Sequence, residues 1–350
     1  MDLSKYKDKG RIGLENLGNT CFLNACMQVL NNTYELNHIL DMDMATNPER
    51  KNIPDTVILN EWNELRQIMW SGNGIVTPRK FVHNVQRIAK EKNRDLFTGN
   101  AQNDMPEFLL FFMDCIHSSI SCHVKMNING TPKNEIDKVA IKCYEMLKQT
   151  YLNEYSAIMN TFYGIYVSMI ESNQTGTIYT TTPGSFFVLD IPVADNSVLF
   201  TTLYQCIDEY TKPEILEGEN AWYNETTRQK EDVKKQIRFW NFPNIIIIAL
   251  NRFTPDGMRK INNNIDFPLD DLDLSKYVCG YNASSYKYEL YGICNHIGGV
   301  SGGHYTAFVR NVDNIWLHYN DREVEVVDNP SAVISPAAYC LFYRKKNNHV

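Results

Sequence analysis

The pattern of hydrophobic residues changes about halfway along the chain. In the first half, apolar residues recur three and four positions apart, which is the spacing of one face of an α-helix. The helices that this spacing predicts lie in the second half of residues 13–30, at 55–71, after Thr77-Pro78, after a cap at Asn103 or Asp104, and from 135 to about 151. Residues 36–54 lack the pattern and are predicted to form loop and turn.

From Phe162 onward the spacing changes to every second residue, and Tyr, Thr, Val, Ile and Phe become common. Both features are typical of β-strands. Strands are predicted over residues 164–170, 176–182, 186–191, 236–242, 245–250, 288–294, 304–309, 315–319, 324–327 and 339–343. Residues 192–200 and 210–232 are polar and are predicted to be connections.

Helices followed by strands predict an α+β fold in which the two kinds of element form separate layers. Residues 1–12 read as a short polar arm, and the sequence contains no internal repeat and no low-complexity tract. A functional site is therefore expected in a cleft between the helical half and the sheet half.

One cysteine stands at the start of a predicted helix. Cys21 follows a loop that contains Gly13 and Gly18, and Asn19 or Thr20 is placed to cap the first helical turn. Unpaired backbone N–H groups and the positive end of the helix dipole favour a thiolate there, and a thiolate is a nucleophile. The alternative is that Cys21 is a small buried apolar residue, as most free cysteines are.

A second stretch supplies a candidate base. Residues 291–310 read as an apolar strand, a glycine-rich loop and another apolar strand, which His304 opens. Asn320 lies sixteen residues after His304, and Asp321 follows it directly. Cysteine early in the chain, histidine late, and Asn or Asp soon afterwards is the order of a papain-like catalytic triad.

The composition argues against several other classes of protein. Of the 350 residues, 43% are hydrophobic and 21% are charged, which is ordinary for a globular protein. The net charge of −7 argues against nucleic acid as the main partner. The N-terminus has no apolar run and no apolar stretch approaches ~20 residues, so neither a signal peptide nor a membrane span is expected. Nine cysteines without regular spacing indicate reduced thiols and a cytoplasmic or nuclear location.

Five motifs spread over nearly the whole chain resemble, in order, those of the ubiquitin-specific proteases, a large family of cysteine deubiquitinases. The first is similar to the family's Cys box, and the last is similar to its His box. The five segments are Gly13-Leu-Glu-Asn-Leu-Gly-Asn-Thr-Cys-Phe-Leu-Asn, Gln102-Asn-Asp-Met-Pro-Glu-Phe, Leu250-Asn-Arg-Phe253, Ile261-Asn-Asn-Asn-Ile-Asp-Phe-Pro-Leu269 and Gly303-His-Tyr-Thr-Ala-Phe.

The resemblance implies a papain-like α+β fold with a helical thumb, a β-sheet palm and β fingers around a bound ubiquitin. One catalytic domain would span residues 13–346, with the thumb at 13–160, the fingers at roughly 161–242 and the palm in the remainder. Residues 347–350 would be a C-terminal tail. The implied activity is hydrolysis of isopeptide and peptide bonds after the C-terminal glycine of ubiquitin. Two alternatives stay open: a protease for another ubiquitin-like modifier, and an inactive ubiquitin-binding scaffold.

Five residues are candidates for the chemistry of this reaction. Cys21 is the nucleophile, and His304 is the base, which is imidazolium beside the thiolate and later protonates the leaving amine. The resemblance places Asn320 as the orienter that accepts the Nδ1–H of His304, with Asp321 as the alternative orienter or a turn residue. Asn16 is inferred to donate its amide N–H to the oxyanion, and its alternative role is to form a turn.

The resemblance also suggests a channel for the C-terminal tail of ubiquitin, which ends in two glycines. Such a channel must approach the substrate backbone closely, and the glycines of the 298–303 loop permit this approach. Asp104 is a candidate partner for an arginine of the tail, a helix-capping carboxylate, or both. The candidate tail-binding residues are Gln102, Asp104, Glu107, Gly298, Gly299, Gly302, Gly303 and Tyr305.

Many members of the family hold a structural zinc ion in the fingers with two Cys-x-x-Cys pairs. The matching positions here are Ser172, Thr175, Trp222 and Glu225, so we expect no metal and no other cofactor. The residues expected to stabilise the fingers by strand pairing and aromatic packing instead are Tyr166, Val167, Ile178, Tyr179, Trp222 and Tyr223. The expected partners are ubiquitin or ubiquitinated proteins, without nucleic acid or membrane, and the protein is expected to be a monomer.

Overall fold

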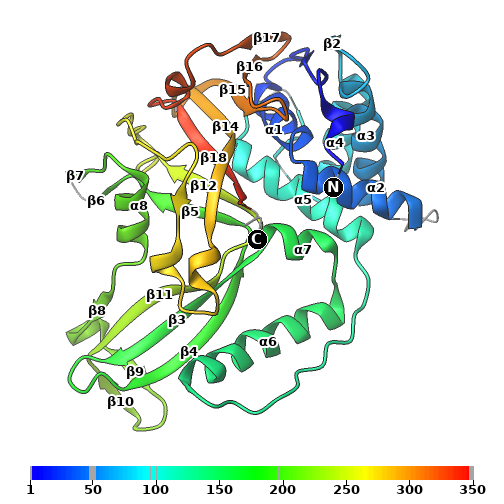
Figure 1. The fold of residues 1–350 in the computed structure, drawn as a ribbon. Helices are drawn as coiled ribbons and strands as arrows, with labels where there is room; N and C mark the ends of the chain where they lie inside the picture. The colour runs from blue at the N-terminus through cyan, green and yellow to red at the C-terminus, as the bar shows by residue number, and fades with distance from the viewer. Residues whose placement is uncertain (1, 47–52, 95, 100, 196–197, 347–350) are drawn as a thin grey trace.

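The computed structural model describes residues 2–46, 53–94, 96–99, 101–195 and 198–346. In Figure 1 the helices of the first half of the chain gather on one side, and most of the β-strands form the other. The predicted order of helices first and strands second is confirmed for the main elements. The predicted C-terminal tail, residues 347–350, lies outside the described residues. Within the described residues, no helix has both the length and the apolar character needed to pass through a bilayer.

The first half is helical, as its pattern predicts. Its helices are α1 (Cys21–Asn31), α2 (Tyr34–Thr46), α3 (Pro54–Met69), α4 (Arg79–Glu91), α5 (Met105–Ile120), α6 (Glu135–Asn153) and α7 (Ala157–Phe162). Helix α5 is capped as expected, because the Asp104 carboxylate accepts the backbone N–H of Glu107 at 3.1 Å. Helix α4 follows Thr77-Pro78 as predicted, but Thr77 does not cap it, because Pro78 is the N-cap residue and the Thr77 hydroxyl donates to Glu15.

The prediction of loop and turn at residues 36–54 is also wrong, because α2 fills most of the described part. Leu36 and Leu40 are buried, whereas Met42 and Met44 are exposed, so the helix has only a short apolar face. A helix with so weak a pattern depends on packing rather than on its own sequence. The single-sequence pattern therefore misses it.

The larger sheet has eight strands and packs against the helices. Its strand order is β17-β16-β15-β14-β18-β12-β5, and β13 pairs with β14 at the side. Every pair is antiparallel except β5 with β12. The strands are β5 (Val188–Pro192), β12 (Ile245–Asn251), β13 (Leu272–Asp273), β14 (Lys287–Gly299), β15 (Gly302–Arg310), β16 (Trp316–Asn320), β17 (Glu323–Val326) and β18 (Ala338–Lys345).

The smaller sheet has the order β4-β3-β11-β8 and extends away from α1 to α5, while α6 packs along it. Its strands are β3 (Gly164–Ser172), β4 (Ile178–Phe186), β8 (Glu214–Leu216) and β11 (Val233–Asn241). The prediction of plain connections at 192–200 and 210–232 is wrong in the described part. These segments hold the short strands β6 (Ala194–Asp195), β7 (Val198–Leu199), β8, β9 (Trp222–Asn224) and β10 (Gln229–Glu231), and α8 (Leu203–Tyr210) lies between them. Strands of two or three residues are too short to show a period of two.

The N-terminal segment packs onto the helices rather than forming only a polar arm. The Tyr6 side chain is buried, and its ring centroid lies 4.7 Å from that of Tyr34 and 4.6 Å from that of Trp70. Strand β1 (Ile12–Leu14) pairs in parallel with β2 (Gly74–Val76). One aromatic residue among charged neighbours gives no periodic signal, so the sequence pattern misses this contact.

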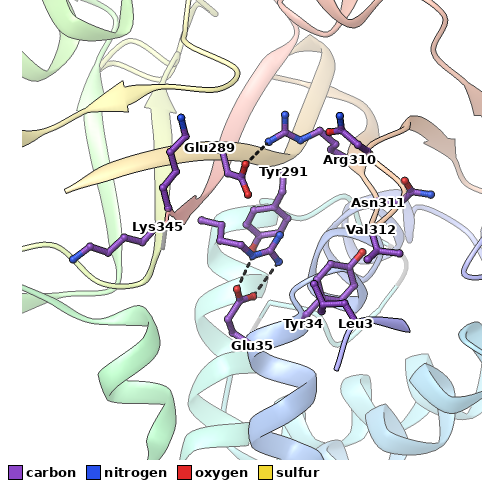
Figure 2. A pocket seen from close by; sticks show the side chains of 12 residues that line it. Leu3, Tyr34, Glu35, Glu289, Tyr291, Arg310, Asn311, Val312 and Lys345 are labelled. Carbon is purple, nitrogen blue, oxygen red and sulfur yellow. Dashed lines mark hydrogen bonds and ion pairs between the residues drawn. The ribbon is translucent and has the colours of Figure 1, made fainter. Parts of the chain in front are cut away.

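A partly buried ion pair joins α2 to the larger sheet. The guanidinium of Arg344, on β18, donates to the two carboxylate oxygens of Glu35 at 2.5 and 3.0 Å. It also lies 5.0 Å from the ring centroid of Tyr34 and 4.4 Å from that of Tyr291. Figure 2 shows Tyr34, Glu35 and Tyr291 around the same pocket, which has a volume of about 500 Å³. This two-point geometry fixes how α2 sits on the sheet.

Two glycines allow the helical half to approach the sheet closely. A Cβ atom on Gly292 of β14 would lie 2.5 Å from a methyl carbon of Val29 on α1. A Cβ atom on Gly13 would lie 2.1 Å from the carbonyl oxygen of Arg322, just after β16. These contacts hold α1 against β14 and bring the Ile12–Leu14 segment next to the turn between β16 and β17.

We expect the Gly13→Ala substitution to lower the free energy of unfolding by about 1–3 kcal/mol, because the added methyl group overlaps the Arg322 backbone. Urea unfolding measures this difference. Gly72→Ala is the matched control, since no atom lies within 4 Å of a methyl group there. Equal unfolding free energies for the two variants would contradict the close approach.

Candidate active site

Cys21 is the first residue of α1, and its side chain is 3% exposed. The preceding loop turns sharply, with positive φ angles of 97° at Gly18 and 55° at Asn19. Thr20 occupies the N-cap position, but its side chain makes no capping bond, and its hydroxyl accepts the backbone N–H of Leu17 at 2.9 Å. The prediction that Cys21 lies at a helix N-terminus is confirmed, while side-chain capping by Thr20 is wrong.

The surroundings of Cys21 oppose ionisation of its thiol. Burial raises the pKa of Cys21, and the negative charge of Asp321 raises it further. Hydrogen bonds from the backbone of Tyr305, Phe22 and Cys21 itself act in the opposite direction but do not cancel the rise. The sequence argument for a thiolate favoured by the helix N-terminus therefore omits the larger effect, which is desolvation.

His304 lies on β15 and contacts the end of β16. Its Nε2 lies 2.7 Å from the amide oxygen of Asn320. Because that oxygen only accepts, Nε2 carries the hydrogen, and Nδ1 is the basic nitrogen of the neutral ring. The predicted pairing of His304 with Asn320 is confirmed, but the predicted nitrogen, Nδ1, is wrong.

Asp321 connects the cysteine loop to the turn after β16. Its carboxylate accepts the Asn16 Nδ2–H at 3.0 Å and the Asn24 Nδ2–H at 2.8 Å. Its backbone oxygen accepts the N–H of Leu14 at 2.9 Å. One carboxylate oxygen lies 4.0 Å from His304 Nε2, farther away than the Asn320 oxygen. Asp321 is thus a bridging residue, with a turn conformation at a φ of 51°.

The amide of Asn16 is held in a fixed orientation. Its oxygen accepts the backbone N–H groups of Gly18 at 3.0 Å and Thr20 at 3.1 Å, as in a turn. Its nitrogen donates one N–H to Asp321, which leaves the second N–H for another acceptor. The turn-forming role is confirmed, and the oxyanion role stays a prediction.

The sequence analysis assigned no role in the site to Asn24. This residue lies on α1, three positions after Cys21, and its side chain is buried. Besides its bond to Asp321, its amide donates to the Leu14 carbonyl at 3.2 Å. The sequence does hold a signal for this role, since Asn24 is an amide among the apolar residues of the helix that begins at Cys21. A polar side chain buried there needs hydrogen-bond partners.

Several of the candidate tail-binding residues meet at one pocket of about 380 Å³. The candidates that line it are Gln102, Asp104, Gly299, Gly302 and Tyr305. Gly303 adjoins the pocket, because its backbone exchanges two hydrogen bonds with the Gln102 side chain, at 2.6 and 2.8 Å. Asp104 also accepts the Tyr339 hydroxyl at 2.7 Å. Glu107 lines a different pocket beside Leu110 on α5, and Gly298 lines neither.

His296 is a residue of the tail pocket that the sequence analysis did not single out. Its ring centroid lies 4.8 Å from that of Tyr305 and 5.8 Å from those of Phe253 and Tyr339. Burial, and then the charge of Lys260, lower the pKa of His296 to about 4. The ring is therefore neutral at physiological pH. The sequence signal for a role of His296 in this pocket is its position just before the glycine-rich loop of residues 298–303.

The described residues contain no group of three or more His, Cys, Asp or Glu side chains that could hold a metal ion. The absence of zinc stays a prediction. In the region predicted as fingers, the rings of Tyr179 and Trp222 stack with centroids 5.6 Å apart, as expected for aromatic packing. Glu231 accepts side-chain hydrogen bonds from Asn224 at 2.9 Å and Thr227 at 2.6 Å, which closes the β9–β10 hairpin.

A sequence model described as "Ubiquitin carboxyl-terminal hydrolase" matches residues 12–343. The chain belongs to the ubiquitin carboxyl-terminal hydrolase family. Human Ubiquitin carboxyl-terminal hydrolase 2 is 32% identical over 349 residues, which cover 96% of this chain and 55% of the human protein. Ubiquitin carboxyl-terminal hydrolase Usp2 of Drosophila melanogaster is 31% identical over 343 residues, covering 97% of this chain and 35% of that protein. This family member thus spans between about a third and about half of the length of these relatives.

Solved structures confirm the predicted fold of this ubiquitin carboxyl-terminal hydrolase. The SAGA DUB module that contains Ubp8, bound to monoubiquitin, matches 99% of this chain and 72% of the other chain, with a TM-score of 0.72 at 23% identity. The same kind of module bound to ubiquitin aldehyde matches with a TM-score of 0.71 at 22% identity. These matches establish the α+β fold of the family for this chain.

The neutral state of His296 predicts a pH dependence of stability. Because its pKa is lower in the folded chain than in the unfolded chain, its contribution is fully present above about pH 6.5 and is lost as the pH falls toward about 4. Between these values the wild type should lose about 3 kcal/mol more unfolding free energy than His296→Phe. Urea unfolding at a series of pH values measures the difference.

His83→Phe is the control for this comparison, because it removes an exposed histidine from α4. Parallel pH curves for the wild type and His296→Phe would show that His296 does not have a lowered pKa.

Proposed function

We propose that this chain is a thiol-dependent deubiquitinase that hydrolyses the bond after the C-terminal glycine of ubiquitin. The observation that carries the proposal is the 2.7 Å contact between His304 Nε2 and Asn320, on strands beside the helix that begins at Cys21. Family membership supports it, and so do the two solved relatives, which are bound to monoubiquitin and to ubiquitin aldehyde.

In the first half of the reaction, the Cys21 thiol transfers its proton to His304 Nδ1 and the sulfur attacks the carbonyl carbon of the terminal glycine. The C–N bond then breaks, and the departing amine takes the proton from the imidazolium. A thioester between Cys21 and the modifier remains. In the second half, water attacks the thioester while His304 accepts a proton. The C–S bond breaks, the modifier leaves with a free carboxyl group, and the thiol is restored.

His304 has to supply the positive charge that stabilises the Cys21 thiolate. Burial and Asp321 both raise the pKa of Cys21, so the isolated thiol stays protonated at neutral pH. An imidazolium next to the sulfur offsets both effects, because it places an opposite charge in a site with little water. Asn320 keeps the ring in the orientation that presents Nδ1. In this proposal Asn320 is the orienter, and Asp321 is a positioning residue.

The oxyanion of the tetrahedral intermediate is proposed to accept two donors. One is the second Nδ2–H of Asn16, whose first N–H is held by Asp321. The other is the backbone N–H of Cys21, which belongs to the first turn of α1, where backbone N–H groups have no helical partner. Fixed donors of this kind need no rearrangement as the charge develops.

Asn16→Ala is expected to lower kcat by about 10²–10³-fold with little change in KM, because an oxyanion donor acts in the transition state. Steady-state kinetics on a fluorogenic ubiquitin amide measure both constants. A change in KM alone would mean that Asn16 only shapes the loop.

The function itself is tested with fluorogenic C-terminal amides of ubiquitin and of other ubiquitin-like modifiers, assayed in parallel. Wild type should release the fluorophore from ubiquitin, and Cys21→Ala should release none. Cys122→Ala is the control, because Cys122 is an exposed free cysteine outside the site. Hydrolysis of another modifier alone, or of none, would point to the protease for that modifier or to the inactive scaffold.

We also propose that residues 13–160, roughly 161–242 and the remainder act as thumb, fingers and palm. The described β5 qualifies this division, since it lies within 161–242 but pairs with β12 in the larger sheet. We propose that the chain acts as a monomer on ubiquitinated proteins, in the cytoplasm or the nucleus. Light scattering of the purified protein, alone and with ubiquitin, tests the oligomeric state.

A further inference from the structure

The turn that joins β14 to β15 lines two pockets with different charge. Residues 299–302 belong to both. The first is the tail pocket, whose charged lining residue is Asp104. The second is an open pocket of about 600 Å³, and its only charged lining residues in the described part of the chain are Arg259 and Lys260.

Neither of these cations has a carboxylate partner within the described residues. No carboxylate oxygen there lies within 4.0 Å of the Arg259 guanidinium or the Lys260 ammonium. Lys260 donates to the backbone carbonyl of His296 at 2.5 Å. Asp256, three residues before Arg259, uses its carboxylate for hydrogen bonds inside its own turn. The pocket therefore presents two positive charges that form no ion pair within the described residues. Asp256 nevertheless lies near, because the hydrogen bonds of its turn, and then the charge of Arg259, lower the pKa of Asp256.

Lys260 is partly buried, and a further cation lies behind it. Burial, and then the charge of Arg252, lower the pKa of Lys260 to about 8. Arg252 itself is fully buried, and its Nη2 has no hydrogen-bond partner within the described chain. Placing like charges together away from water is unfavourable unless an anion joins them. A ligand with negative charge would offset that cost.

We propose that Arg259, Lys260 and the 299–302 turn form a binding site for a carboxylate or phosphate group of the substrate, next to the tail pocket. Asn262 also lines the pocket and offers amide N–H groups to the same anion. The inference rests on the proposed function, because it adds one contact to the same substrate. The anion is carried either by the modifier or by the protein joined to it, and the chemistry of recognition is the same.

The position of this site connects it to catalysis. The shared turn leads directly into Gly303, which is held by Gln102, and then into His304. An anion bound against the turn adds binding energy close to the reacting carbonyl. The acidic and the basic pocket also favour one orientation of a substrate that carries opposite charges along its length. The site is thus expected to determine which acidic substrates are cleaved fastest.

The test compares Arg259→Gln and Lys260→Gln with Arg79→Gln, which removes an exposed positive charge from the start of α4. Each is assayed for kcat/KM on three substrates. One is a fluorogenic amide of ubiquitin, and the other two are ubiquitin joined by an isopeptide bond to a lysine peptide flanked by glutamates or by glutamines. Arg259→Gln is the deciding variant, because Arg259 is exposed and bears no core contact.

If the anion belongs to the joined protein, the wild type should favour the glutamate peptide over the glutamine peptide by about 3- to 10-fold. Arg259→Gln and Lys260→Gln should lose this preference, and Arg79→Gln should keep it. If the anion belongs to the modifier, the two site variants should instead lose about 3- to 10-fold on the fluorogenic amide, and added salt should reduce the difference.

Values of kcat/KM for Arg259→Gln that equal those of Arg79→Gln on all three substrates would overturn the anion site. Wild-type activity in that experiment would still support the proposed function. Loss of wild-type activity on every substrate would contradict the proposed function instead, so the two failures are distinguishable.

Discussion

The geometry of the candidate active site depends on the carboxylate of Asp321. This group accepts hydrogen bonds from Asn16 and Asn24, one on the cysteine loop and the other on the cysteine helix. Asn320, the next residue back along the chain, holds the ring of His304. A charged acceptor makes stronger hydrogen bonds than a neutral one. The Asp321 side chain is only 16% exposed, so water competes little for these bonds. One turn between two strands thereby positions Cys21, His304 and Asn16 together, which are the proposed nucleophile, base and oxyanion donor.

This arrangement has a chemical cost. The charge that holds Asn16 and Asn24 also raises the pKa of Cys21, and burial of the thiol acts in the same direction. The proposed mechanism therefore relies on His304 for charge compensation and on fixed donors for the transition state, rather than on a free thiolate. The glycine-rich turn of residues 299–302 borders two pockets of different charge. Asp104 lines one pocket, and the cations of Arg259 and Lys260 line the other.

The sequence predicts the parts of the fold that have a local signal. Cys21 lies at a helix start because its neighbours form an apolar stripe, and His304 lies near the start of β15, whose residues Tyr305 to Val309 are largely apolar. Helix α2 and the short strands of 210–232 have no such stripe, since distant contacts hold them. The rotation of the His304 side chain decides which of its ring nitrogens faces Asn320. The spacing of residues along the sequence does not predict this rotation. The role of Asn24 appears only once residue 321 lies beside α1. Residues 259 and 260 line one pocket, without an ion-pair partner in the described chain, only through folding.

The most direct test of a catalytic Cys21 is covalent capture. Ubiquitin with an electrophile in place of its terminal carboxylate should form one adduct per chain, and peptide mass spectrometry should locate it on Cys21. The other eight cysteines should remain unmodified, because most of them are buried with raised pKa values and the proposed mechanism places the end of the modifier at Cys21. An adduct on another cysteine, or an adduct that persists in Cys21→Ala, would contradict the account.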